Sequence, residues 1–176
     1  MKFFETPLKG AFIIDLEKRE DDRGFFARTW DENEFKEHGI YRKLVQTNMA
    51  YSKKKGTLRG LHYQTKPYQE AKLIRCTQGA IYDVIIDVRK NSPTYKKWFG
   101  VELSCKNYKI LFLSEGFAHG FLTLEDNTEV SYQVSAFYNF DSERIIRYND
   151  PAFNIKWPIE VTVLSEKDKN NPDFKE

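Results

Sequence analysis

Short apolar runs bounded by turn residues recur along the whole chain, and many alternate between apolar and polar positions. Helical periodicity between these runs is scarce. Many short strands at this spacing are typical of a sandwich or barrel, so the pattern predicts an all-β fold. The predicted strands are "AFIIDL", "GFFARTW", "TLRGLHYQ", "AKLIRC", "AIYDVIIDV", "WFGVELS", "KILFLS", "HGFLTL" and "EVSYQVSAFY".

Two of these strands indicate what faces the interior. In "AIYDVIIDV", Asp83 and Asp87 share the face opposite the fully apolar one. A carboxylate inside a barrel needs a partner or a function, because burial penalises its charge. In "EVSYQVSAFY", strict alternation predicts that both tyrosines look into the apolar side. The residues expected on that side are Val130, Tyr132, Val134, Ala136 and Tyr138.

Two short helices are predicted outside the strands. Asp31 followed by Glu34 resembles a capping box ahead of "EFKEHG", and Gly39 is placed to end that helix. Ser165 opens "SEKDKNN" in the same way, with Asp168 three residues later. Both helices are too short to form a layer of their own, so we expect them at the periphery of the β-fold.

Composition limits the class of protein. At 176 residues the chain is predicted to form one domain spanning 1–176. Its 28 Lys and Arg nearly balance 26 Asp and Glu, which gives no indication of a nucleic-acid or membrane partner. Cys76 and Cys105 are expected to be free thiols, and no apolar run resembles a signal peptide or a membrane span. These features predict a soluble, cytoplasmic protein.

Polar side chains of complementary chemistry lie within the predicted strands. A lone His62 or His119 would most simply be a hydrogen-bonded structural residue. Together with Arg59, Lys72 and Tyr132, however, these histidines resemble a site. The chain has no GxSxG elbow and no glycine-rich phosphate loop. What remains is acid and base chemistry, in which a histidine accepts a proton, a tyrosine donates one and a cation stabilises an oxyanion.

A metal site is the competing interpretation. "GLHYQ", with Glu70 further on, and "SEGFAHG" resemble the two motifs of the cupin superfamily, many members of which bind a metal. Gln64 stands where the first motif usually has its second histidine, which leaves at most His62, Glu70 and His119 as ligands. Three ligands can still bind a catalytic metal. We nevertheless expect a site without metal, in which Glu70 is a supporting charge.

Longer motifs identify a family. "GTLRGLHYQ", "EAKLIRCTQGAIYDVIIDVRKNSPTY", "EGFAHGF", "YNDPAFNIKWP" and "LSEKD" together resemble the dTDP-4-dehydrorhamnose 3,5-epimerase family over nearly the whole chain. The resemblance implies a cupin-type jelly roll, a homodimer and no cofactor. It also implies epimerisation of a nucleotide-linked 4-keto-6-deoxy sugar.

The same resemblance assigns roles to individual residues. His62 matches the general base, and Asp168 the carboxylate that pairs with it. Tyr132 matches the acid that protonates the opposite face of the sugar carbon, and Lys72 the cation beside the 4-oxygen. Tyr138 fits a stacking or positioning role. The positions associated with substrate binding are Arg23, Gln46, Asn48, Arg59, His119, Glu143 and Lys167.

Two features of the chain affect this site. Strict alternation sends Arg59 and His62 to opposite faces of one strand, unless Gly60 hosts a bulge that re-aims one of them. Arg28 stands at a substrate-binding position that usually carries glutamate in the family, which is a charge reversal. The alternatives to a two-carbon epimerase are a single-carbon epimerase of another deoxyketosugar, for example a CDP-linked one, and a non-catalytic sugar-binding cupin.

Overall fold

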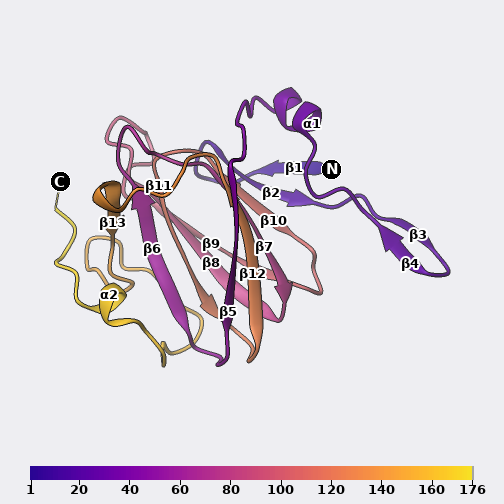
Figure 1. Cartoon of the computed structure of the whole chain (residues 1–176). Coiled ribbons are helices and arrows are strands. Elements are labelled where there is room, and N and C mark those ends of the chain that lie inside the picture. Colours follow the sequence, from indigo (N-terminus) through magenta and orange to yellow (C-terminus); the bar gives the residue numbers. More distant parts are fainter. Residues whose placement is uncertain (176) are drawn as a thin grey trace.

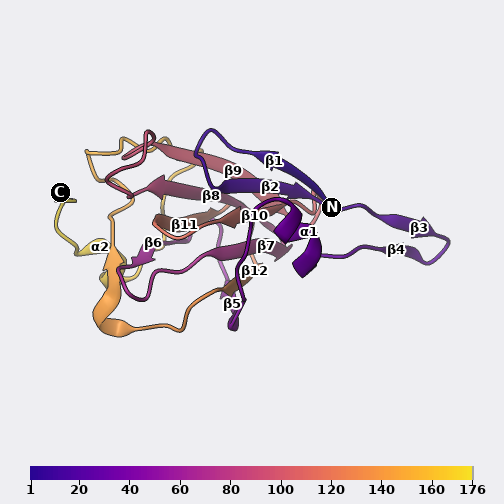
Figure 2. The same cartoon turned by 90° about the horizontal axis from the view of Figure 1, so that it is seen from above.

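The computed structural model describes residues 1–175, and two antiparallel sheets face each other in it (Figures 1 and 2). This double-sheet jelly roll confirms the predicted all-β class. The first sheet contains, in spatial order, β1 (Lys2–Glu5), β2 (Ala11–Asp15), β10 (Ile110–Leu113), β7 (Lys72–Gln78), β12 (Thr128–Val134) and β5 (Gln46–Ser52).

The second sheet lies across the core from the first. Its central strands are long and apolar because both of their faces are covered. Ile81, Ile85 and Phe117 pack toward the first sheet, whereas Val84 and Ala118 pack outward under the C-terminal segment. The order of strands is β13 (Glu143–Ile145), β6 (Leu58–Gln64), β11 (Phe117–Thr123), β8 (Ala80–Asp87) and β9 (Trp98–Ser104).

The helices are short and peripheral, as expected. Asp31 caps α1 (Glu32–Glu37) by accepting from the backbone N–H groups of Asn33 and Glu34. Ser165 caps α2 (Glu166–Lys169) in the same manner. A single 3₁₀ turn, η1, spans Phe140–Ser142. None of the helices in residues 1–175 is long and apolar enough to cross a membrane.

The segment "GFFARTW" differs from the prediction. Only Gly24–Phe26 forms a strand, β4, and it pairs with β3 (Arg19–Asp21) instead of joining either large sheet. Figures 1 and 2 show this hairpin standing away from the sandwich. Phe26 is 63% exposed there. A two-stranded hairpin has few contacts of its own and is only marginally stable in isolation.

The strand "EVSYQVSAFY" is also shorter than predicted. Val130 and Val134 are buried and Tyr132 packs against the core, but β12 ends at Val134. Tyr138 therefore lies beyond the strand and is 56% exposed. The chain turns here because the Asn139 side chain caps η1. A local cap thus replaces the ladder that alternation alone would have continued.

Candidate active site

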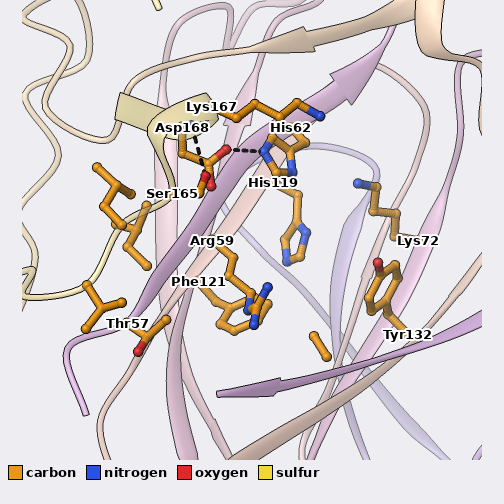
Figure 3. Close-up of a pocket in the computed structure, with 14 residues that line it drawn as sticks. Thr57, Arg59, His62, Lys72, His119, Phe121, Tyr132, Ser165, Lys167 and Asp168 are labelled. Carbon is orange, nitrogen blue, oxygen red and sulfur yellow. Dashed lines mark hydrogen bonds and ion pairs between the residues drawn. The ribbon is translucent and has the colours of Figure 1, made fainter. Parts of the chain in front are cut away.

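A cavity of about 450 Å³ opens between the two sheets, and a hollow of about 370 Å³ adjoins it. The two share His62, Lys72 and Tyr132. Figure 3 shows side chains from several strands and from α2 turned toward the first cavity. The other predicted site residues around the two spaces are Gln46, Asn48, Arg59, His119, Tyr138, Glu143, Lys167 and Asp168.

A bulge in β6 brings Arg59 and His62 to one side. His62 pairs with His119 on β11, and Arg59 pairs with Phe121. Between these two pairs β6 therefore contains one residue more than β11. Gly60 allows this because its φ is +115° and its Cα approaches β11 closely. A Cβ at Gly60 would lie 2.6 Å from the Cα of Gly120. The bulge predicted at Gly60 is confirmed.

His62 is paired with the carboxylate of Asp168. Its Nε2 lies 2.6 Å from Oδ1 of Asp168, and Asp168 is almost fully buried. Burial disfavours the charged carboxylate, but hydrogen bonds from His62 and other donors outweigh it and lower the pKa of Asp168. This charge fixes the orientation of the ring and leaves Nδ1 of His62 for another partner. An imidazole held in this way can act as a base.

Tyr132 and Lys72 lie across the cavity from the His62–Asp168 pair (Figure 3). Burial, with a contribution from the charge of Glu70, raises the pKa of Tyr132. Tyr132 therefore remains a phenol at neutral pH and can donate a proton. Lys72 is only 8% exposed, and its Nζ lies 3.1 Å from Oε1 of Glu70. The cavity thus brings together side chains that can serve as a base, an acid and a cation.

A second histidine and carboxylate pair lies deeper. Nε2 of His119 is 3.0 Å from Asp83, whose side chain is completely buried. Burial raises the pKa of Asp83. The pattern of β8 had placed Asp83 inside without identifying its partner, because β8 and β11 become neighbours only in the folded sheet.

Cations and acceptors surround the rim. Arg59 donates through Nε to Oγ of Ser52 and through Nη2 to the carbonyl oxygen of Tyr51. On the opposite rim, Nζ of Lys167 lies 2.5 Å from Oε2 of Glu143. The phenol of Tyr138 donates to the same oxygen at 3.1 Å. The rim therefore offers positive charge close to the cavity, as a bound phosphate group would require.

Arg23 and Arg28 are not brought to this cavity. Arg23 lies at the turn of the projecting hairpin and forms an ion pair with Asp21. Arg28 follows β4 and pairs with Asp31 at 2.7 Å. The hairpin leaves the sandwich, so neither guanidinium lines the cavity of its own chain.

The three ligands that the metal interpretation would need are each paired with another side chain: His62 with Asp168, Glu70 with Lys72 and His119 with Asp83. Gln64 is 3% exposed and donates to Glu70, and Glu70 in turn binds Lys72. Among residues 1–175, no three His, Cys, Asp or Glu side chains are grouped so as to hold a metal ion. The cupin motif alone predicts Gln64 as a lost ligand. Its position two residues after His62, on the same side of β6, was the signal that it faces the site.

Comparison with known proteins shows the family of the chain. The sequence model of the family described as dTDP-4-dehydrorhamnose 3,5-epimerase matches residues 5–176. The enzyme of that name from Shigella flexneri is 43% identical over 99% of this chain and 96% of its own.

Two solved structures are similar to this fold. The dTDP-4-dehydrorhamnose 3,5-epimerase of Bacillus anthracis, with TDP and PPi bound, is 42% identical and superposes with a TM-score of 0.95 over 98% of this chain and 99% of its own. The 3,5-epimerase of Legionella pneumophila, in complex with dTDP-4-keto-L-rhamnose, is 37% identical with a TM-score of 0.90 over 96% and 89%. The chain belongs to the dTDP-4-dehydrorhamnose 3,5-epimerase family.

Proposed function

We propose that this protein is an isomerase that converts dTDP-4-dehydro-6-deoxy-D-glucose to dTDP-4-dehydro-L-rhamnose, without a cofactor. The observation that supports this best is the opposition of His62, paired with Asp168, to Tyr132 across one cavity. Inversion at a carbon requires a base on one face and an acid on the other. A base and acid on the same face would return the original stereochemistry.

The proposed chemistry uses side chains alone. His62 accepts the proton from the carbon beside the ketone, and the electron pair of that C–H bond moves to form an enolate. The ammonium of Lys72 stabilises the negative oxygen. Tyr132 then gives its proton to the opposite face of the same carbon, and the ketone re-forms. Proton exchange with solvent afterwards returns His62 and Tyr132 to their starting forms.

Substrate binding follows from the two adjoining spaces. The reacting ring lies where they meet, because His62, Lys72 and Tyr132 line both. Arg59 and Lys167 supply positive charge at the rim for the diphosphate, and Tyr138 offers an exposed ring for stacking. The relatives from Bacillus anthracis and Legionella pneumophila hold TDP and a dTDP-sugar, respectively, which supports a dTDP-linked substrate here.

The protein acts as a homodimer whose projecting hairpins are exchanged. Family resemblance assigns Arg23 and Arg28 to substrate binding, yet both lie on a segment that leaves the sandwich (Figure 1). A second copy reconciles these facts if the hairpin of one protomer reaches the cavity of its partner. The exposed Phe25 and Phe26 favour the same arrangement, because a partner surface would cover them.

Solvent isotope exchange tests the reaction. The protein is incubated with dTDP-4-keto-6-deoxyglucose in heavy water, and deuterium is followed by NMR. Incorporation at both carbon 3 and carbon 5 is expected. Incorporation at one carbon would indicate a single-carbon epimerase, and no incorporation with either dTDP- or CDP-linked ketosugars would refute epimerase activity.

The variant that tests the role of the proposed base is His62→Ala, measured beside the wild type. It should remain folded and lose activity about a hundredfold or more, as expected for removal of a general base. A wild type that binds the sugar nucleotide without any exchange, and that His62→Ala matches in affinity, would identify a sugar-binding protein instead.

A further inference from the structure

Glu70 connects the cation of the site to a fixed anchor. One carboxylate oxygen, Oε1, lies 3.1 Å from Nζ of Lys72, and the other, Oε2, accepts from Nε2 of Gln64 at 3.2 Å. The Glu70 and Lys72 side chains are only 12% and 8% exposed. Lys72 has a long, flexible stem, so without a buried anion its ammonium would sample several positions. Glu70 restricts it to one.

Gln64 is itself held at both ends of its amide. The oxygen accepts from the backbone N–H of Asn139 at 2.6 Å. The amide nitrogen, besides facing Glu70, lies 2.9 Å from the carbonyl oxygen of Tyr68 and 3.2 Å from that of Phe137. Because the oxygen must meet a donor and the nitrogen must meet acceptors, the amide has one favourable orientation. Neither a carboxylate nor an apolar side chain could satisfy both ends.

The charge of Glu70 also acts on the acid of the site. Several charged or titratable side chains face Tyr132 across the two spaces. They are Glu70 and Lys72 at the start of β7, Arg59 and His62 on β6, and His119 on β11. Burial is the main cause that raises the pKa of Tyr132, the negative charge of Glu70 adds to it, and Arg59 opposes it. Glu70 therefore favours the protonated phenol while it attracts the ammonium.

We propose that Glu70, oriented by Gln64, is a positioning residue that fixes the Lys72 ammonium where the enolate oxygen forms. The proposal rests on the epimerisation proposed above. Glu70 lies behind Lys72, and it acts on the reaction only through Lys72 and Tyr132. The position that serves as a metal ligand in many cupins thus serves here to orient a lysine. Gln64, two residues after the base, is what makes this arrangement rigid.

The test compares Glu70→Gln with the wild type and with Glu129→Gln. The first variant keeps the size of the side chain and an acceptor for Gln64 but loses the charge. Glu129 lies on β12 outside the cavity, where it accepts from Thr77, so it is a matched control. Glu70→Gln should lower kcat about 10- to 100-fold with little change in KM, as expected for a misplaced catalytic group. Glu129→Gln should behave as wild type.

Two further readouts separate positioning from general damage. The basic limb of the kcat profile should move to lower pH in Glu70→Gln, because Tyr132 loses the neighbouring negative charge. Gln64→Glu, which leaves Glu70 in place but sets a second carboxylate against it, should also lower kcat more than it raises KM. If Glu70→Gln fails to fold, the fall in kcat of Gln64→Glu tests the proposal in its place.

The outcomes are distinguishable from failure of the proposed function. A wild type without isotope exchange would refute the epimerisation and this inference together. An active wild type beside folded Glu70→Gln and Gln64→Glu variants with unchanged kcat and pH profile would overturn this inference alone. A fall in kcat that is accompanied by a fall in melting temperature, without a shift of the basic limb, would also overturn it, since that result would indicate a purely structural role.

Discussion

His62 and Asp168 are separated by 106 residues in the chain, yet Nε2 of the histidine lies 2.6 Å from Oδ1 of the aspartate. The C-terminal segment makes this contact possible by docking along β6. Thr57 and Val163 form a parallel bridge, and the backbone N–H of Leu58 donates to the carbonyl oxygen of Val163. The proposed base is therefore complete only when the last part of the chain has packed against the second sheet.

Replacing the carboxylate should impair the base without removing the cavity. In Asp168→Asn, the amide cannot stabilise a protonated His62, so kcat should fall on the order of a hundredfold or more. Glu166→Gln is the matched control, because Glu166 lies on the same short helix and its carboxylate accepts a hydrogen bond from the nearby Asn170. Steady-state kinetics distinguish the two. Equal activity of both variants would contradict the role assigned to Asp168.

Removing the phenol should separate proton removal from inversion. Tyr132→Phe keeps His62, so deuterium from heavy water should still enter the sugar carbon from the base's own face. Product of inverted configuration should fall on the order of a hundredfold. NMR of substrate and product measures both. Tyr51→Phe, whose hydroxyl bonds to Asn127 away from the cavity, should behave as wild type. Normal inversion by Tyr132→Phe would assign the acid to another group.

A side chain at the bulge should disturb the strand pairing. Gly60→Ala adds a Cβ that meets the backbone of Gly120 at a φ that favours glycine, and we expect a loss of about 2 kcal/mol or more in unfolding free energy. Gly39→Ala also places an alanine at a positive φ, +77° instead of +115°, but with no atom within 4 Å of the added Cβ. It should cost about 1 kcal/mol. Urea denaturation compares them, and equal losses would show that the close approach is unimportant.

Mixed dimers should reveal exchange of the hairpins. One protomer carries His62→Ala, and the other carries Arg23→Ala with Arg28→Ala. If each hairpin serves its partner, one cavity of the mixed dimer has both an intact His62 and intact arginines. Turnover by doubly tagged, purified mixed dimers should then exceed that of either variant alone. No gain would mean that the arginines serve their own protomer or no site at all.

Asp87 should make folding stability depend on acidic pH. Burial disfavours its charge, but hydrogen bonds from Arg89, Ser92 and Thr94 outweigh this and lower its pKa to about 2. A depressed carboxyl pKa stabilises the fold above the ordinary value and loses that stabilisation as pH falls through about 2. Asp87→Asn should therefore cost on the order of 2 kcal/mol at neutral pH.

The cost of Asp87→Asn should shrink as the pH is lowered toward the pKa of the carboxyl group. Denaturant unfolding at several pH values measures this difference. Asp141→Asn, at an exposed position, should leave stability unchanged throughout. If Asp87→Asn lowered the unfolding free energy by the same amount at every pH, the charge of Asp87 would not be what stabilises the fold.

The sequence by itself determined the all-β class and the two capped helices, and it named most of the polar side chains that line the cavity. The class and the helices depend on alternation, turn residues and caps, which act between near neighbours. Alternation also located Asp83 inside the fold. It failed at Tyr138, because β12 ends at Val134 and a capped 3₁₀ turn follows. It also failed at "GFFARTW", where the hairpin leaves both sheets.

Only the tertiary structure decided how the residues of the site meet. The bulge at Gly60 depends on the close approach of β11. The pair of His62 with Asp168 joins β6 to α2, and the pair of His119 with Asp83 joins β11 to β8, so both pairs join elements that are distant in sequence. From the sequence, Gln64 was only the replacement of a metal ligand, whereas in the fold its amide donates a hydrogen bond to Glu70. Such contacts are set by which segments pack together, and that is a property of the whole chain.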